Sequence, residues 1–153
     1  MIHLDHLTTT PPLPEVIDAM RPWHESRFGA AGSLHQLGLE ARDALDEARS
    51  RLAKLVNTTD PEEIIFTSNG TEAVNLAVKG AALANRRFGK HIVTTQIEHP
   101  AVLSSIAWLE EQGFECTQLS VDNQGRIDPV ALGQALRDDT ALVCLHHASH
   151  DLG

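Results

Sequence analysis

Cysteine is scarce in this sequence, with only Cys116 and Cys144 among 153 residues, and both lie inside apolar runs. So low a count argues against a disulfide framework and favours two small core residues. No apolar run is long enough to cross a bilayer, and the first five residues lack the basic and apolar regions of a signal peptide. We therefore expect a cytoplasmic protein without a membrane partner.

Basic residues are also few. The sequence has 12 Lys and Arg against 21 Asp and Glu, which gives a formal net charge of −9. A surface that binds nucleic acid needs clustered Lys and Arg, so this balance argues against a nucleic-acid partner. Hydrophobic residues make up 42% and charged residues 22%, as in globular proteins, and the length is sufficient for one domain with a core.

Helix and strand patterns alternate in the second part of the chain. Short apolar runs predict strands, and apolar residues at helical spacing, often after a proline, predict helices. Val102, Ile106 and Leu109 mark the expected buried face of the helix that begins at Pro100. The expected strands are residues 63–67, 91–95, 114–121 and 141–145, and the other expected helices are 70–87, which we expect to be well buried, and 129–137. This alternation predicts an α/β layer with a largely parallel sheet.

The first sixty residues have a different, helical pattern. Leu13, Val16, Ile17 and Met20 have helical spacing, and a longer helix is predicted to begin near Ser33, whose hydroxyl would form a capping box with the Gln36 amide. We therefore divide the chain into an N-terminal helical segment, residues 1–60, and an α/β domain, residues 61–153.

The segment from Thr67 to Glu72 is the first candidate site. It joins a predicted strand to a predicted helix, where open α/β sheets bind ligands. The N–H groups at a helix start suit a phosphate, Gly70 lets the backbone approach closely, and the Thr71 hydroxyl adds a donor. The alternative is a polar turn that only caps the helix.

Glu98-His99-Pro100 is the second candidate site, directly after the strand at 91–95. We expect it at the same edge of the sheet as Thr71. There His99 could stack on a planar cofactor or move protons. The alternative is a histidine that is hydrogen-bonded or solvated near a helix start.

A third cluster comprises His146, His147, His150 and Asp151. Its composition suits a metal. Neighbouring residues of a strand point to opposite faces, however, so His146 and His147 cannot both face one ion. We therefore expect no native metal site.

Several motifs, in order and over nearly the whole chain, resemble those of the cysteine desulfurase family, which is related to class-V aminotransferases. The most specific is Ile64-Ile65-Phe66-Thr67-Ser68-Asn69-Gly70-Thr71-Glu72-Ala73-Val74-Asn75-Leu76-Ala77, which resembles Ile-Phe-Thr-Ser-Gly-Gly-Thr-Glu-x-x-Asn-x-Ala. The others are Leu4-Asp5-His6-Leu7-Thr8-Thr9-Thr10, Phe28-Gly29-Ala30-Ala31-Gly32-Ser33-Leu34-His35, Glu98-His99-Pro100-Ala101-Val102-Leu103, Val121-Asp122 and Gly125-Arg126-Ile127-Asp128.

The resemblance implies the fold and the activity. The fold would be the N-terminal part of an aspartate-aminotransferase-type (fold type I) transferase that depends on pyridoxal 5'-phosphate (PLP), with a largely parallel sheet flanked by helices. The activity would be conversion of L-cysteine to L-alanine, with the sulfur held as an enzyme persulfide for iron–sulfur cluster assembly or another sulfur acceptor protein. A homodimer is also implied.

The resemblance also assigns roles to residues. Gly70 and Thr71 would hold the PLP phosphate, and His99 would stack on the pyridine ring and assist proton transfer. His150 stands where the family has the Asn that contacts the pyridoxal hydroxyl.

The family's remaining catalytic groups align with no residue of this chain. The Asp that pairs with the pyridine nitrogen, the Schiff-base Lys and the persulfide Cys all lie beyond Gly153 in the family. Lys54, Lys79 and Lys90 are the lysines present, and none aligns with the Schiff-base position, so a covalent PLP linkage is not possible there.

Three interpretations remain open. The favoured one is a truncated or split desulfurase, inactive until a C-terminal portion is supplied. The second is another class-V aminotransferase or lyase on the same scaffold. The third is a non-catalytic remnant or interaction module, toward which His150 at the Asn position points.

Overall fold

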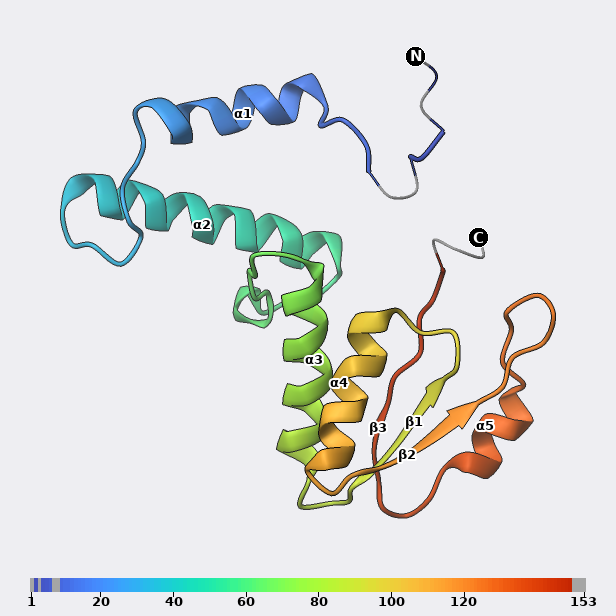
Figure 1. The fold of residues 1–153 in the computed structure, drawn as a ribbon. Helices are drawn as coiled ribbons and strands as arrows, with labels where there is room; N and C mark the ends of the chain where they lie inside the picture. The colour runs from blue at the N-terminus through green and yellow to red at the C-terminus, as the bar shows by residue number, and fades with distance from the viewer. Residues whose placement is uncertain (1, 3, 7–8, 150–153) are drawn as a thin grey trace. The chain divides into compact units, whose positions relative to one another are not determined.

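The computed structural model describes residues 2, 4–6 and 9–149, and the chain divides into two units between Phe66 and Thr67 (Figure 1). The first unit contains helices α1 (Pro14–Glu25) and α2 (Gln36–Leu55) and the 3-10 turn η1 (Pro61–Glu63). The second contains α3 (Gly70–Asn85), β1 (His91–Thr95), α4 (Pro100–Glu111), β2 (Glu115–Leu119), α5 (Pro129–Ala135) and β3 (Thr140–Val143).

The start of α2 differs from the sequence prediction. The helix begins at Gln36, and its N-cap is His35, whose Nδ1 accepts a hydrogen bond from the Gly38 N–H at 3.3 Å. The predicted capping box at Ser33 is therefore wrong. The imidazole provides the acceptor that we expected from the Ser33 hydroxyl, so the helix starts later than the rule for hydroxyl caps indicates.

Residues 63–67 do not form a strand, so the strand predicted there is wrong. Residues 64–67 are irregular, and Ile65 is 66% exposed. The Arg49 guanidinium donates from Nε to the Ile64 carbonyl at 3.1 Å and lies over the Phe66 ring. An apolar run becomes a strand only when a neighbouring strand accepts its hydrogen bonds, and here a side chain of α2 meets the carbonyl instead.

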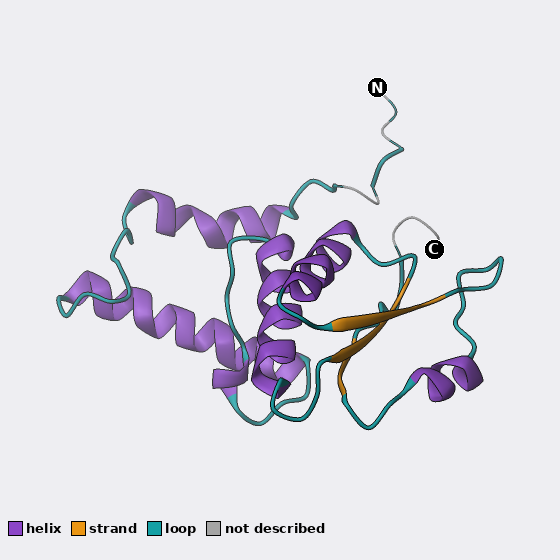
Figure 2. Cartoon of the chain, turned by 60° about the horizontal axis from the view of Figure 1, so that its bottom comes forward, coloured by secondary structure: helices purple, strands orange, loops and turns teal. Residues whose placement is uncertain are grey.

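The second unit holds a parallel β-sheet (Figure 2). The sheet has three strands, in the order β2-β1-β3. His91 pairs with Glu115 and Thr95 with Leu119, so β1 and β2 are in register over their full length. All five residues of β1 are buried, because it is the central strand. The predictions of a parallel sheet and of a strand at 91–95 are confirmed, whereas β2 and β3 are shorter than expected.

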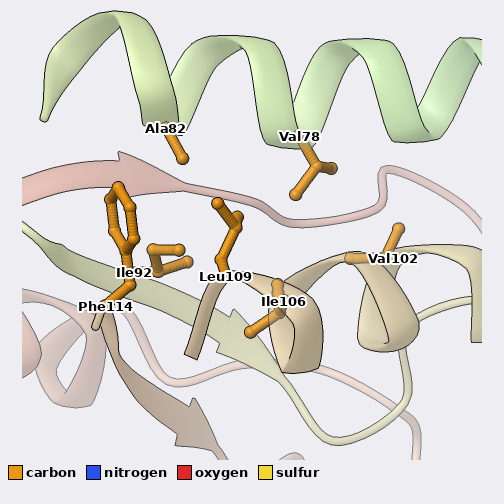
Figure 3. Packing of buried hydrophobic residues seen from close by; sticks show 7 residues of the cluster. All are labelled: Val78, Ala82, Ile92, Val102, Ile106, Leu109 and Phe114. Atoms are coloured by element: carbon orange, nitrogen blue, oxygen red, sulfur yellow. The ribbon is translucent and has the colours of Figure 1, made fainter. Parts of the chain in front are cut away.

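α3 and α4 pack side by side on one face of this sheet and form the core (Figure 3). The face predicted for α4 is confirmed, since Ile106 and Leu109 are almost completely buried. α3 is less buried than expected, because Leu76 and Leu83 are exposed. The core residues are Val78, Ala82, Ile92, Val102, Ile106, Leu109 and Phe114. Among the described residues, none of the helices is both long enough and apolar enough to span a membrane.

Candidate functional site

The N-terminal end of α3 is a capped turn. Asn69 is the N-cap, and its Oδ1 accepts a hydrogen bond from the Glu72 N–H at 2.9 Å. The Glu72 carboxylate turns back toward Ser68 and accepts from its hydroxyl at 2.6 Å and its N–H at 2.7 Å. The hydrogen bond from the Ser68 hydroxyl, followed by that from its backbone, lowers the pKa of Glu72. The turn is thus held in one shape by reciprocal bonds.

Gly70 and Thr71 are the first two residues of α3. Their N–H groups belong to the first helical turn, where no carbonyl of the helix can accept from them. A Cβ built on Gly70 would meet no atom within 4 Å, so the chain itself does not require glycine at this position. The glycine leaves open space beside donor groups at the positive end of the helix dipole, which suits a phosphate group.

His99 lies between β1 and α4 and is the N-cap of α4. Its Nδ1 accepts a hydrogen bond from the Ala101 N–H at 3.0 Å, and Pro100 occupies the first helical position. With Nδ1 accepting, the neutral ring carries its proton on Nε2. The alternative of a histidine that is hydrogen-bonded near a helix start is therefore confirmed. This capping hydrogen bond orients the ring through Nδ1 rather than through Nε2.

The two helix starts lie at one end of the second unit. α3 and α4 run in the same direction, and Lys79 and Trp108, which stand at similar positions along their helices, are in contact, with Nζ 4.9 Å from the ring centroid. In Figure 1 both helices begin at the end toward which β1 points. Gly70, Thr71 and His99 therefore share the carboxyl end of the sheet, where open α/β sheets bind ligands.

Glu98 is a buried residue to which sequence reasoning assigned no role. Its side chain is 2% exposed, and Oε1 accepts from the Thr95 hydroxyl at 2.8 Å and from the His146 N–H at 3.1 Å. It lines a cavity of about 270 Å³ together with Arg126, His146 and His147. A charged residue directly after a buried strand is a signal that could have identified it, because charges are buried only with partners.

The structure describes the histidine cluster near residue 146 only as far as Ser149. The Nδ1 of His146 lies 3.1 Å from Glu98 Oε2. His150, the expected contact of the pyridoxal hydroxyl, lies outside the described residues, as does Asp151. Within the part of the chain that the structure describes, no three His, Cys, Asp or Glu side chains lie close enough to hold a metal ion.

Cys116 and Cys144 pack against the core, as predicted. Burial, with a smaller contribution from Glu110, raises the pKa of Cys116 to about 11. Burial also raises the pKa of Cys144, with Glu98 adding to the effect. A nucleophilic cysteine needs thiolate at neutral pH, and the burial of both side chains disfavours the thiolate.

Comparisons with known proteins show what the whole chain is similar to. The chain is 46% identical over 152 residues to cysteine desulfurase IscS of Dictyoglomus turgidum, an alignment that covers 99% of this chain and 38% of that protein. It is 44% identical to the IscS of Methanosarcina thermophila over 99% of this chain and 37% of that protein. The chain therefore spans well under half the length of these curated relatives.

Solved structures give the fold. A NifS-like protein has a TM-score of 0.91 and 32% identity, covering 97% of this chain and 41% of its own. SspA in complex with cysteine has a TM-score of 0.92 and 32% identity, covering 100% of this chain and 44% of its own. The expected N-terminal part of a fold type I transferase is confirmed. Because the sequence model of class-V aminotransferases matches residues 2–153, the chain belongs to the aminotransferase class-V family.

Proposed function

We propose that this chain contributes the phosphate-binding turn and the ring-packing histidine of a PLP-dependent cysteine desulfurase. Such an enzyme removes sulfur from L-cysteine, giving L-alanine and an enzyme persulfide for iron–sulfur cluster assembly or another sulfur acceptor protein. The observation that carries the proposal is that the open first turn of α3 and His99 share the carboxyl end of β1. The identity to IscS proteins supports cysteine as the substrate.

Each of the site residues has a role that follows from its chemistry. The N–H groups of Gly70 and Thr71 and the Thr71 hydroxyl donate to phosphate oxygens. His99 packs against the cofactor ring and holds a proton at Nε2, because Nδ1 is occupied by the Ala101 N–H. PLP, when bound, supplies the electron sink for breaking bonds at the substrate amino acid.

We propose that polypeptide outside residues 1–153 supplies the family's Asp, Schiff-base Lys and persulfide Cys. The described thiols have raised pKa values, which agrees with this assignment. We therefore propose that the 153-residue polypeptide alone does not desulfurate cysteine. We also propose that the active enzyme is a homodimer in which these groups are present.

Calorimetric titration with PLP and with inorganic phosphate tests the site. We expect Gly70→Val to lower the affinity for both ligands by about tenfold or more, because the valine side chain occupies the space through which a phosphate approaches the helix start. Gly80→Val is a matched control, since a Cβ at Gly80 on the same helix also meets nothing within 4 Å. We expect His99→Ala to lower the affinity for PLP but not the affinity for phosphate. Equal binding by wild type and Gly70→Val would contradict the proposal.

Borohydride reduction after incubation with PLP tests the covalent chemistry. We expect the mass of the intact 153-residue chain to be unchanged, because Lys54, Lys79 and Lys90 do not stand at the family's position. A stoichiometric pyridoxyl adduct on one lysine, lost in Thr71→Ala, would overturn this expectation.

A further inference from the structure

Glu98 joins two segments that are far apart in the sequence. From the β1 side, the Thr95 hydroxyl donates to Oε1 at 2.8 Å. From the segment after β3, the His146 N–H donates to the same oxygen at 3.1 Å, and His146 Nδ1 lies 3.1 Å from Oε2. Within the described residues, the fully buried side-chain nitrogens and oxygens all have hydrogen-bond partners. Both oxygens of the buried carboxylate therefore have partners in these two segments.

The contact lies just beyond the point at which the sheet stops holding these segments together. β1 and β3 pair up to Val93 and Val143, and the Cys144 N–H donates to the Val93 carbonyl at 2.9 Å. The Thr94 hydroxyl then donates to the Cys144 carbonyl at 3.0 Å. The next link along the chain is the one from His146 to Glu98, so side chains continue the connection after the backbone ladder has ended.

Glu98 directly precedes His99, and His99 caps α4 through Ala101. We propose that Glu98 is a positioning residue, which holds the loop that carries His99 against the segment that follows β3. The use of this positioning in catalysis rests on the proposed function, because His99 acts on a cofactor only there. Substitution of the carboxylate leaves the Thr95 hydroxyl and the His146 N–H without their acceptor, and a buried donor without an acceptor is costly.

Hydrogen exchange with mass spectrometry tests the link on the full 153-residue chain without PLP. We expect Glu98→Ala to accelerate amide exchange about tenfold or more in two peptides, one covering residues 96–101 and the other residues 144–149. The loss of one buried hydrogen bond has an effect of that order. Exchange in the core peptide 104–111 should stay within about twofold of wild type. Glu111→Gln, which changes an exposed carboxylate at the end of α4, should change none of these rates.

A second readout separates positioning from general stabilisation. The nitrogen chemical shifts of the His99 ring report its tautomer, and we expect Glu98→Gln to lower the fraction with the proton on Nε2, because the cap at Ala101 loosens. Three results would overturn the proposal: faster exchange at 96–101 alone, a uniform increase that includes the core, or no protection of either segment in the wild type. PLP is absent throughout, so failure of the proposed function would leave this result unaffected.

Discussion

At the scale of the residue, histidine takes a capping role that is more common for Ser, Thr, Asp and Asn. His35 and His99 both accept a backbone N–H through Nδ1 at a helix start. Asn69 and Asp128 cap their helices in the usual way. For His99 the cap has a chemical consequence, because it directs the proton of the neutral ring to Nε2.

The thiol of Cys116 should react slowly in the folded chain. Its pKa of about 11, raised from the model-compound value of 9.0, leaves about a hundredfold less thiolate at neutral pH. We expect iodoacetamide to alkylate the folded chain correspondingly more slowly than the urea-unfolded chain, with the rate measured by intact mass. Cys144→Ala isolates the rate of Cys116. Equal rates in the folded and unfolded chains would show that the thiol is not desolvated.

At the scale of the element, one buried histidine links all three strands. His91 is completely buried in β1, with Nδ1 2.9 Å from Thr140 Oγ1 and Nε2 2.8 Å from Thr117 Oγ1. Burial lowers the pKa of His91, and Arg137 adds to the effect, while Asp139 and Glu115 partly oppose it. The sheet therefore favours the neutral ring.

This arrangement predicts a pH-dependent stability. Because the folded pKa lies below the unfolded value near 6.5, the unfolded chain binds more protons in that range. The contribution of neutral His91 to the free energy of unfolding is present above about pH 6.5 and is lost as the pH falls through and below that value. Urea unfolding at about pH 7.5 and about pH 5.5 measures this loss. His91→Gln should show a smaller pH dependence, whereas His24→Gln, which changes an exposed side chain, should behave like wild type. A wild-type stability that rises on acidification would contradict the prediction.

At the scale of the whole molecule, many large apolar side chains are exposed. Leu13 is 66% exposed and Phe28 74%, while Val16, Ile17 and Met20 are about half exposed along α1. Such apolar surface promotes association, and the net charge of −9 opposes it only in part.

We therefore expect the isolated 153-residue chain to be oligomeric, loosely packed or poorly soluble. Size-exclusion chromatography with light scattering and near-UV circular dichroism measures this. Met20→Lys should shift the distribution toward monomer, because it interrupts the apolar face of α1, whereas Glu15→Lys on the same helix should not. A sharp monomer peak with rigid tertiary signals and cooperative unfolding would show that the chain is self-sufficient.

Local patterns were sufficient for several features of the second unit. The strand at His91–Thr95 and the start of α4 at Pro100 are found as predicted. In the turn after β2, the Asp122 carboxylate accepts from the Gln124 and Arg126 N–H groups, and Gly125 has a φ of 74°. Each of these depends on a residue's own backbone preference or on contacts with its near neighbours in sequence.

The sequence by itself therefore determined the family, the parallel sheet and the placement of Gly70, Thr71 and His99 at helix starts. Tertiary structure alone decided that residues 63–67 do not form a strand, because pairing depends on a neighbour that the run cannot specify. It also decided the partner of Glu98, which is His146, 48 residues away. A hydrophobic pattern records which side chains avoid water, whereas the partner of a buried charge depends on which distant segments the fold brings together.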